Sequence, residues 1–241
     1  MNLIIDCGNT RIKLAVFNKS KLIYNEAFTA DNFVKVVLNC IDKFNCKHAI
    51  ISSVGAIKIQ EINKIKEKIT LIELNSSTKI PFLNKYSTPK TLGVDRIGLV
   101  AAAVSQFPKT NVLVIDAGTC ITYDFVDANA NYSGGAISPG IKIRYKSLNK
   151  FTKKLPLLEP DFDVELIGDS TEKSIHSGIA FGILGEIDSI IKMYKNKNED
   201  LTVVLTGGDV KFLSNKLKNS IFANSNFLLE GLNSILTYNL K

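Results

Sequence analysis

Two short segments of this chain combine an aspartate, a glycine and a threonine in the same order, and each could bind phosphate. The first is D-C-G-N-T-R-I-K, from Asp6 to Lys13, and the second is D-A-G-T-C-I-T-Y-D, from Asp116 to Asp124. Such a turn offers backbone N–H groups and hydroxyls to phosphate oxygens, while its carboxylate can hold a metal ion. The alternative is two ordinary hairpins with Asp-Xaa-Gly turns, which are common. The repeated order favours phosphate binding at both turns.

Each acidic turn lies between two predicted strands. The runs Leu3–Ile5 and Val112–Ile115 are wholly apolar, and Ile12–Phe17 and Ile121–Val126 have the composition of returning strands. A third strand follows in both places, so the order β-β-β occurs twice. The pattern predicts an α/β protein made of two similar halves, with a cleft between them as the default ligand site.

The remaining elements are expected to complete these two halves. The Gly row at 178, 182 and 185 should let another backbone approach closely, and Asp31 is expected to be the N-cap of the first helix. The expected helices cover residues 31–43, 57–69, 92–107, 141–151 and 171–194 and two short closing segments, and the expected strands cover 21–28, 49–52, 70–74, 132–137 and 203–205.

Length and composition limit the class of protein. The chain has 241 residues, 45% of them hydrophobic, which is enough for one large domain or two small ones. We expect a boundary near Lys109, giving halves 1–109 and 110–241. A continuous apolar run of membrane-spanning length is missing from the sequence, which predicts a cytoplasmic protein. The four cysteines form no C-x-x-C pair and are expected to be buried or half-buried thiols.

The basic residues are unevenly divided between lysine and arginine. Net charge is +7, which permits attraction to nucleic acid or other polyanions, but the lysines are scattered and no nucleic-acid-binding motif is visible, so nucleic acid is not the expected partner. A phosphorylated small-molecule substrate would benefit from the same positive field. Of 30 basic residues, only Arg11, Arg96 and Arg144 are arginine. An arginine kept in such a sequence is a candidate for a role that needs its planar, multi-donor fork.

In six motifs the chain resembles the type III pantothenate kinases of the acetate and sugar kinase, Hsp70 and actin superfamily. In chain order these motifs are D-C-G-N-T-R-I-K, Y-S-T-P-K-T-L-G-V-D-R (Tyr86–Arg96), D-A-G-T-C-I-T-Y-D, G-G-A-I-S-P-G (Gly134–Gly140), S-T-E-K-S-I-H-S-G (Ser170–Gly178) and T-G-G-D (Thr206–Asp209). Two positions depart from the family pattern. Cys7 replaces an aliphatic residue and Cys120 replaces alanine, which could make the site sensitive to thiol reagents.

The resemblance implies a fold and a reaction. The fold would be two duplicated ribonuclease H-like halves, an N-terminal and a C-terminal actin-like half. The reaction would be ATP-dependent phosphorylation of the primary hydroxyl of pantothenate, the first step of coenzyme A biosynthesis. Such a transfer needs alignment of the reacting groups, charge neutralisation and an acceptor for the hydroxyl proton.

By resemblance, Asp95 accepts that proton, and its alternative role is a helix first-turn carboxylate. Arg96, Tyr86, Gly93 and Thr171 would bind pantothenate together with Asp95. Without the resemblance, Arg96 could be a surface ion pair, Tyr86 a loop anchor, and Thr171 an N-cap or first-turn residue.

The resemblance also assigns the ATP and cation sites. Asp116 matches a ligand for a monovalent cation, K⁺ or NH₄⁺, and Asp6 is a candidate partner for Mg²⁺. Asp124 is as well explained by a structural hairpin role. Gly207 and Gly208 could let adenosine lie against the backbone, or could simply form a strand–helix turn. The residues expected to bind ATP are Asp6, Gly8, Asn9, Thr10, Lys13 and Thr119.

Other interpretations remain open at this point. A non-catalytic regulatory relative would be expected to have lost Asp6, Asp95, Asp116 or Thr119, and all four are present. A sugar kinase of the same superfamily would carry a zinc-binding Cys/His cluster, which is missing from this sequence, and a polyphosphate or nucleotide hydrolase is a further option. The resemblance implies a homodimer, and the apolar closing helix 228–240 could serve as core or as interface.

Overall fold

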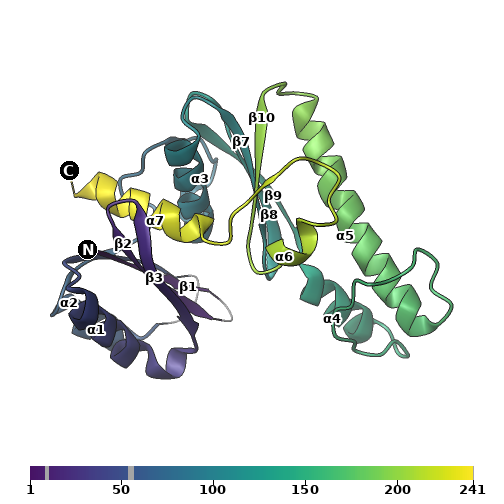
Figure 1. Cartoon of the computed structure of the whole chain (residues 1–241), viewed down its shortest axis with the longest axis horizontal. Helices are drawn as coiled ribbons and strands as arrows, with labels where there is room; N and C mark the ends of the chain where they lie inside the picture. The colour runs from purple at the N-terminus through teal and green to yellow at the C-terminus, as the bar shows by residue number, and fades with distance from the viewer. Residues whose placement is uncertain (9–10, 54–56, 241) are drawn as a thin grey trace. The chain divides into compact units, whose positions relative to one another are not determined.

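A computed structural model describes residues 1–8, 11–53 and 57–240 of the chain (Figure 1). These residues form two compact units. Unit 1 consists of Met1–Lys109, Val126–Gly134 and Asn226–Lys241, and unit 2 consists of Thr110–Phe125 and Gly135–Ser225. The chain therefore returns twice to the first unit after leaving it at Lys109.

Unit 1 is built on a five-stranded sheet in the order β3-β2-β1-β4-β5. The first three strands are antiparallel neighbours, and β4 and β5 are added in parallel. The strands are β1 (Asn2–Cys7), β2 (Ile12–Asn18), β3 (Lys21–Phe28), β4 (His48–Ser53) and β5 (Thr70–Glu73).

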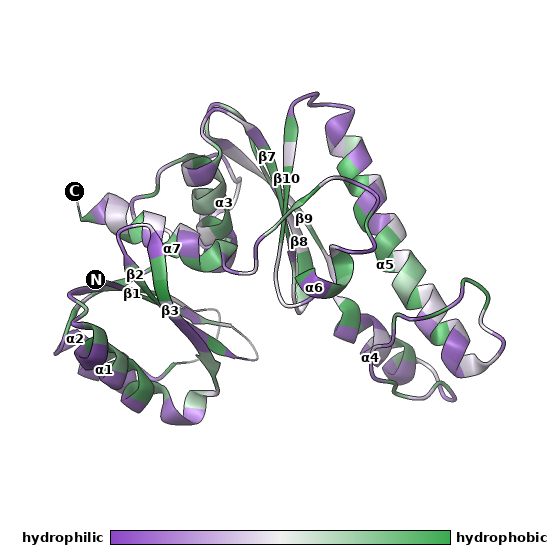
Figure 2. Cartoon of the chain, viewed as in Figure 1, coloured by the Kyte–Doolittle hydropathy of each residue, from purple (hydrophilic) through white to green (hydrophobic). Residues whose placement is uncertain are grey.

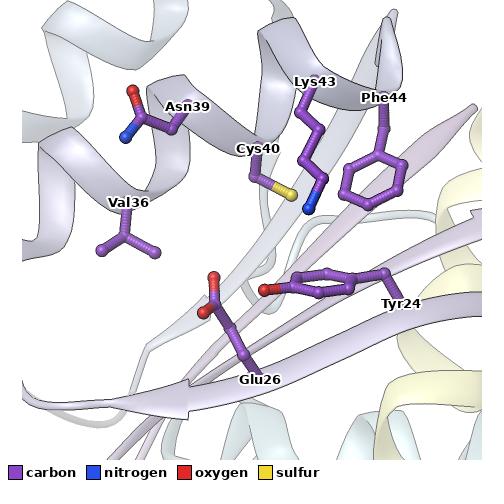
Figure 3. A pocket seen from close by; sticks show the side chains of 7 residues that line it. All are labelled: Tyr24, Glu26, Val36, Asn39, Cys40, Lys43 and Phe44. Atoms are coloured by element: carbon purple, nitrogen blue, oxygen red, sulfur yellow. The ribbon is translucent and has the colours of Figure 1, made fainter.

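Helices α1 (Phe33–Phe44) and α2 (Ile59–Lys66) cover one face of this sheet. Figure 2 shows that α1 has hydrophobic and hydrophilic residues interleaved along its length, as an amphipathic helix does. Beside the edge strand β3, α1 helps enclose a small cavity of about 240 Å³ (Figure 3). The residues that line it are Tyr24, Glu26, Val36, Asn39, Cys40, Lys43 and Phe44.

Helices α3 (Val94–Gln106) and α7 (Phe227–Asn239) pack on each other and contact the other side of the sheet at β4 and β1. Two glycines allow this approach, because a Cβ added to Gly231 would collide with the backbone of Gly98. The core of unit 1 includes Leu229, Leu232, Ile235 and Leu236 of α7. The closing helix therefore serves as core within this chain.

Unit 2 repeats the strand order of unit 1. Its strands follow the order β11-β10-β7-β8-β9. Read from the other end, β9-β8-β7-β10-β11 matches β3-β2-β1-β4-β5, so the duplication predicted from the acidic turns is confirmed. The strands are β7 (Asn111–Ala117), β8 (Cys120–Val126), β9 (Asn131–Pro139), β10 (Leu201–Thr206) and β11 (Phe222–Ala223). The two-residue strand β6 (Leu83–Asn84) belongs to unit 1 and pairs with the start of β9, at Asn131 and Tyr132, which is also part of unit 1.

The core of unit 2 includes a row of isoleucines on the long helix α5 (Thr171–Lys195). By length and composition this helix could cross a membrane, with a mean hydropathy of 1.2. Its apolar side is used inside the unit instead, at Ile175, Ile179, Ile183, Ile187 and Ile191. The other helices are α4 (Ile141–Phe151) and the short α6 (Val210–Leu213).

Several local expectations are wrong. Asp31 lies inside a short 3₁₀ turn, Ala30–Asn32, and α1 begins only at Phe33, so Asp31 is not its N-cap. No backbone approaches the glycines at 178, 182 and 185, because a Cβ added at any of them would meet open space. Cys120 is exposed, unlike the three other cysteines. The strands β6 and β11 were not predicted, since two-residue strands carry no periodicity.

Candidate functional site

In unit 1, three polar side chains lie in one row across the sheet. Asp6 on β1 is paired in register with Lys13 on β2 and with Ser52 on β4. Residues paired in this way project from the same face of a sheet. Their neighbours Ile5 and Ile51 belong to the core beneath α1 and α2, so the row faces the side of α3 and α7.

Burial dominates the electrostatics of Asp6. Its side chain is 7% exposed, and desolvation raises the pKa of the carboxyl group from 3.8 to about 6. The charge of Lys13 lowers this pKa, and the charge of Asp95 raises it further. Asp95 must therefore lie close enough to Asp6 for their charges to interact. The buried carboxylate would gain from a neighbouring cation.

Asp95 stands in the first turn of α3, where Gly93 is the N-cap. The amide N–H of Arg96 donates a hydrogen bond of 2.8 Å to Oδ1 of Asp95. A Cβ at Gly93 would collide with the same carboxylate oxygen. A side chain at this position would therefore force the Asp95 carboxylate to shift.

Tyr86 and Arg96 lie against each other. The guanidinium carbon of Arg96 is 5.5 Å from the centre of the Tyr86 ring, a cation–π arrangement. The Tyr86 ring stacks on that of Tyr132, with centroids 6.2 Å apart, and Gly134 has a φ of +118° beside it. Arg96 is only 5% exposed, which excludes the alternative of a surface ion pair.

Unit 1 thus brings together residues from two motifs far apart in the sequence, the first acidic turn and the G-V-D-R segment. Asn9 and Thr10, which the sequence also assigned to ATP, lie outside the described residues. The N–H of Gly8 donates to the carbonyl oxygen of Arg11 (3.2 Å), which closes the turn. Ser52 was missed, because nothing in a single sequence predicts which strand lies beside β1.

In unit 2, three motifs pack on one another through their backbones. The N–H of Gly140 donates to Thr119 O (3.1 Å), and the N–H of Asp209 donates to Ala117 O (3.0 Å). A Cβ at Gly140 would overlap the second acidic turn, and one at Gly207, where φ is +101°, would overlap the Asp116 carboxylate. The D-A-G-T, S-P-G and T-G-G-D segments therefore form one cluster.

The polar residues of the second acidic turn and its strand differ in burial. Asp116 is partly exposed and Thr119 is exposed, so both are accessible at the turn, whereas Asp124 is fully buried in β8. That burial favours the structural role for Asp124. Burial raises the pKa of the Asp209 carboxyl group, and the charge of Lys142 opposes this effect.

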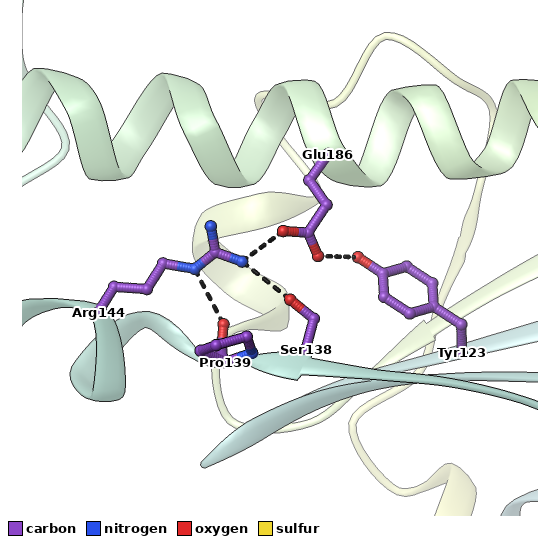
Figure 4. Close-up of polar contacts among 5 residues, drawn as sticks. All are labelled: Tyr123, Ser138, Pro139, Arg144 and Glu186. Atoms are coloured by element: carbon purple, nitrogen blue, oxygen red, sulfur yellow. Dashed lines mark hydrogen bonds and ion pairs between the residues drawn. The ribbon is translucent and has the colours of Figure 1, made fainter. Parts of the chain in front are cut away.

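Arg144 holds the end of β9 to α5 (Figure 4). Its Nε donates to Pro139 O (2.9 Å) and its Nη2 donates to Ser138 Oγ (3.0 Å) and to the Glu186 carboxylate. Tyr123 OH donates to the other oxygen of Glu186 (2.8 Å). Hydrogen bonds from Arg144, Ser138 and Tyr123 lower the pKa of Glu186 although burial raises it. Arg144 therefore uses several donors of its guanidinium group at once, and its role is structural.

Thr171 is the first residue of α5, after the N-cap Ser170, whose Oγ accepts from Lys173 N. It opens onto a cavity of about 650 Å³ between α4 and α5. Its lining combines aliphatic side chains with hydroxyl side chains and one arginine. The lining residues are Arg144, Ser147, Leu148, Leu155, Thr171, Ser174, Ile175, Gly178 and Ile179.

The described part of the chain holds no group of three or more His, Cys, Asp or Glu side chains suited to a metal ion. A dedicated protein cage is not needed for Mg²⁺ in a nucleotide site, because Mg²⁺ keeps several waters and binds through substrate phosphates and one or two carboxylates. Asp6 suits the role of such a carboxylate, because it is a buried oxygen donor whose charge is otherwise poorly compensated.

Solved structures resemble this fold at low sequence identity. A protein from Campylobacter jejuni described as a putative Baf family transcriptional activator aligns with a TM-score of 0.64 at 22% identity, covering 99% of this chain and 98% of that one. A putative N-acetylmannosamine kinase from Listeria monocytogenes aligns with a TM-score of 0.56 at 9% identity, covering 100% and 99%. These likenesses, with the two similar sheets, confirm the two-lobed actin-like α/β fold.

Sequence comparison is more specific. A type III pantothenate kinase from Christiangramia forsetii is 53% identical over 240 residues, 99% of both chains. One from Flavobacterium johnsoniae is 47% identical over 241 residues, 100% of this chain and 99% of the relative. The family model of the type III pantothenate kinases matches residues 2–193. The chain belongs to the type III pantothenate kinase family.

Proposed function

We propose that this chain carries out the family reaction, ATP-dependent phosphorylation of pantothenate to 4′-phosphopantothenate, with Asp95 as the proton acceptor. The family and its activity as a phosphotransferase acting on an alcohol follow from the comparisons. The assignment of Asp95 is supported by one observation above all. Its charge and that of the buried Asp6 interact within unit 1, so a base and a phosphate-binding turn lie close together.

In this mechanism, Asp95 receives the proton of the attacking primary hydroxyl. Oδ1 already accepts the N–H of Arg96, which fixes the carboxylate and leaves Oδ2 to face the alcohol. Because the transition state of phosphoryl transfer is loose, orientation of the hydroxyl contributes as much as removal of its proton. Gly93 leaves the space in which this carboxylate stands.

Arg96 and Tyr86 bind the rest of pantothenate. The guanidinium can grip a carboxylate or amide oxygen through two donors, and the ring of Tyr86 offers apolar surface. Their mutual contact supports a shared pocket. Thr171 is assigned to pantothenate by resemblance, and its position on a cavity lined by both aliphatic and hydroxyl side chains suits a substrate of mixed polarity.

The two acidic turns bind ATP and cations. The turn of unit 1 binds the phosphates through Gly8, Asn9, Thr10 and Lys13, and Asp6 holds Mg²⁺ directly or through water. When bound, Mg²⁺ neutralises charge on the phosphates. The residues of unit 2 assigned here are Thr119, which contacts ATP, and Asp116, which binds the monovalent cation K⁺ or NH₄⁺.

The protein is further proposed to be a cytoplasmic homodimer that binds neither membrane nor nucleic acid. The burial of the α5 isoleucines within unit 2 supports the absence of a membrane span. On another side of α5 the exposed Phe181 lies beside glycines at 182 and 185 whose added Cβ atoms would meet open space, so a second copy could pack there. Light scattering that gives a monomer at micromolar concentration would contradict the dimer.

The deciding assay measures ATP consumption with pantothenate, with sugars and with no acceptor, in buffers with and without K⁺. We expect ATP to be consumed only when pantothenate is the acceptor, and we expect the rate of consumption to depend on K⁺. Asp95→Asn should fold, bind ATP and lose most turnover, because an amide cannot accept the proton. Near-normal turnover by this variant would refute the assignment of the base, and sugar phosphorylation would favour the alternative kinase.

A further inference from the structure

A buried hydroxyl in unit 1 has no partner among the described residues. The side chain of Ser52 is 1% exposed, and its Oγ forms no hydrogen bond with the described part of the chain. A buried hydroxyl without a partner lowers the stability of the fold, and such groups are rare in native proteins. One explanation is that the missing partner is a ligand.

The position of Ser52 identifies the kind of ligand. Ser52 is paired in register with Asp6, on the strand that lies on the opposite side of Asp6 from Lys13. That strand, β4, is also the one that α3 contacts, and α3 carries Asp95. Ser52 therefore lies on the side of Asp6 where α3, the helix that carries Asp95, contacts the sheet. Between a phosphate-binding turn and a base, the group in transfer is the terminal phosphoryl group.

The same arrangement occurs a second time, in unit 2. There Asp116 on β7 is paired in register with Thr206 on the parallel strand β10, and Thr206 is also buried, at 2% exposed. In both units a hydroxyl residue stands beside the acid of the turn, on the corresponding strand. A buried hydroxyl residue repeated beside the acid of each turn indicates that the site needs it, because an apolar side chain would pack there without leaving a polar group to satisfy.

We propose that the Ser52 hydroxyl donates a hydrogen bond to an oxygen of the γ-phosphoryl group of bound ATP. A neutral hydroxyl suits this position, since Asp6 and Asp95 already supply negative charge and a third carboxylate would repel the phosphate. The bond neither makes nor breaks a covalent link; it holds the phosphoryl group in line with the attacking alcohol. This inference rests on the proposed assignment of the Asp6 turn to the ATP phosphates.

The test compares two nucleotides on the full-length protein by calorimetry in the presence of Mg²⁺. One is a non-hydrolysable ATP analogue, which has a γ-phosphoryl group, and the other is ADP, which does not. Ser52→Ala should bind the analogue about tenfold more weakly, the loss expected for one hydrogen bond to a charged group. Its affinity for ADP should match that of the wild type. In the absence of ligand, the variant should unfold at the same temperature or higher, since a buried unpartnered group has been removed.

Ser53→Ala is the matched control, because Ser53 is paired with Cys7 and faces the opposite side of the sheet. It should bind both nucleotides as the wild type does. Unchanged affinity of Ser52→Ala for the analogue, an equal loss for both nucleotides, or a lower unfolding temperature would overturn the inference. Asp6→Asn distinguishes an error in the phosphate assignment from an error in the role of Ser52. If it binds the analogue normally, the phosphate assignment itself is wrong; if it binds weakly while Ser52→Ala binds normally, only the role of Ser52 is wrong.

Discussion

The packing of α7 against α3 should control both stability and catalysis, and Gly231→Ala tests this. A Cβ at Gly231 would lie 2.8 Å from the carbonyl carbon of Gly98 and 3.0 Å from Cβ of Ala102, and closer still to the carbonyl oxygen of Gly98. Non-bonded carbon atoms prefer separations of about 3.5–4.0 Å. The two helices must therefore move apart by about 1 Å.

The cost of this movement can be worked out. Overpacking a core costs about 1–3 kcal/mol, and a clash with backbone falls at the upper end because no side-chain rotation relieves it. The higher helix propensity of alanine offsets up to about 1 kcal/mol of this loss in the free energy of unfolding. We expect a net loss of about 2 kcal/mol in the free energy of unfolding. Since Gly98 is one turn beyond Asp95 on α3, the shift should also misplace Asp95, the proposed base, and about 1 Å of misplacement can lower turnover about 100-fold.

Denaturant unfolding and steady-state kinetics measure the two effects. Gly98→Ala is the matched control at the same crossing, since its Cβ would meet only the side-chain ends of Leu228 and Leu232, which can rotate. Its losses of stability and turnover should be clearly smaller. If Gly231→Ala were as stable and as active as the wild type, the close approach of the two backbones would not be what positions Asp95.

Three further predictions follow from buried or exposed groups. Asp6 binds its proton more tightly in the folded protein, so its contribution to stability falls as pH rises from about 4 through the folded pKa of about 6. In thermal or denaturant unfolding without ligands, the free energy of unfolding of Asp6→Asn should therefore exceed that of the wild type by up to about 3 kcal/mol at pH 8. Near pH 4 the two free energies of unfolding should be about equal. Arg144→Lys should lower the free energy of unfolding by about 1–2 kcal/mol, because an ammonium group cannot hold all three partners drawn in Figure 4; unchanged stability would mean that the fork is dispensable. Mass spectrometry after brief alkylation of the native protein should find Cys120 modified before the buried Cys7, Cys40 and Cys46, and ATP should slow that reaction if Thr119 contacts the nucleotide.

The sequence predicts the repeat well because the repeat is local. Each acidic turn and its flanking apolar runs are adjacent in the chain, and the pairing of the first two strands in each repeat, β1 with β2 and β7 with β8, follows from them. What fails is non-local. Ser52 lies beside Asp6 only because β4 pairs with β1 across about forty residues of chain, and the link from Arg144 to Glu186 likewise joins separate elements. The glycines of α5 were misread because spacing cannot tell a buried contact from an open face.

The glycines of the motifs have a common physical purpose in the two units. At Gly93 an added side chain would occupy the place of the Asp95 carboxylate, and at Gly207 it would occupy the place of the Asp116 carboxylate. In each case a residue with a side chain would force the carboxylate or its neighbours to shift, so glycine lets the acid keep its place. For the roles proposed for Asp95 and Asp116, a carboxylate that keeps its place needs little reorganisation when substrate or cation arrives, which is where such sites gain their effect. The motif glycines would then contribute to the proposed chemistry because they leave room for the two acids.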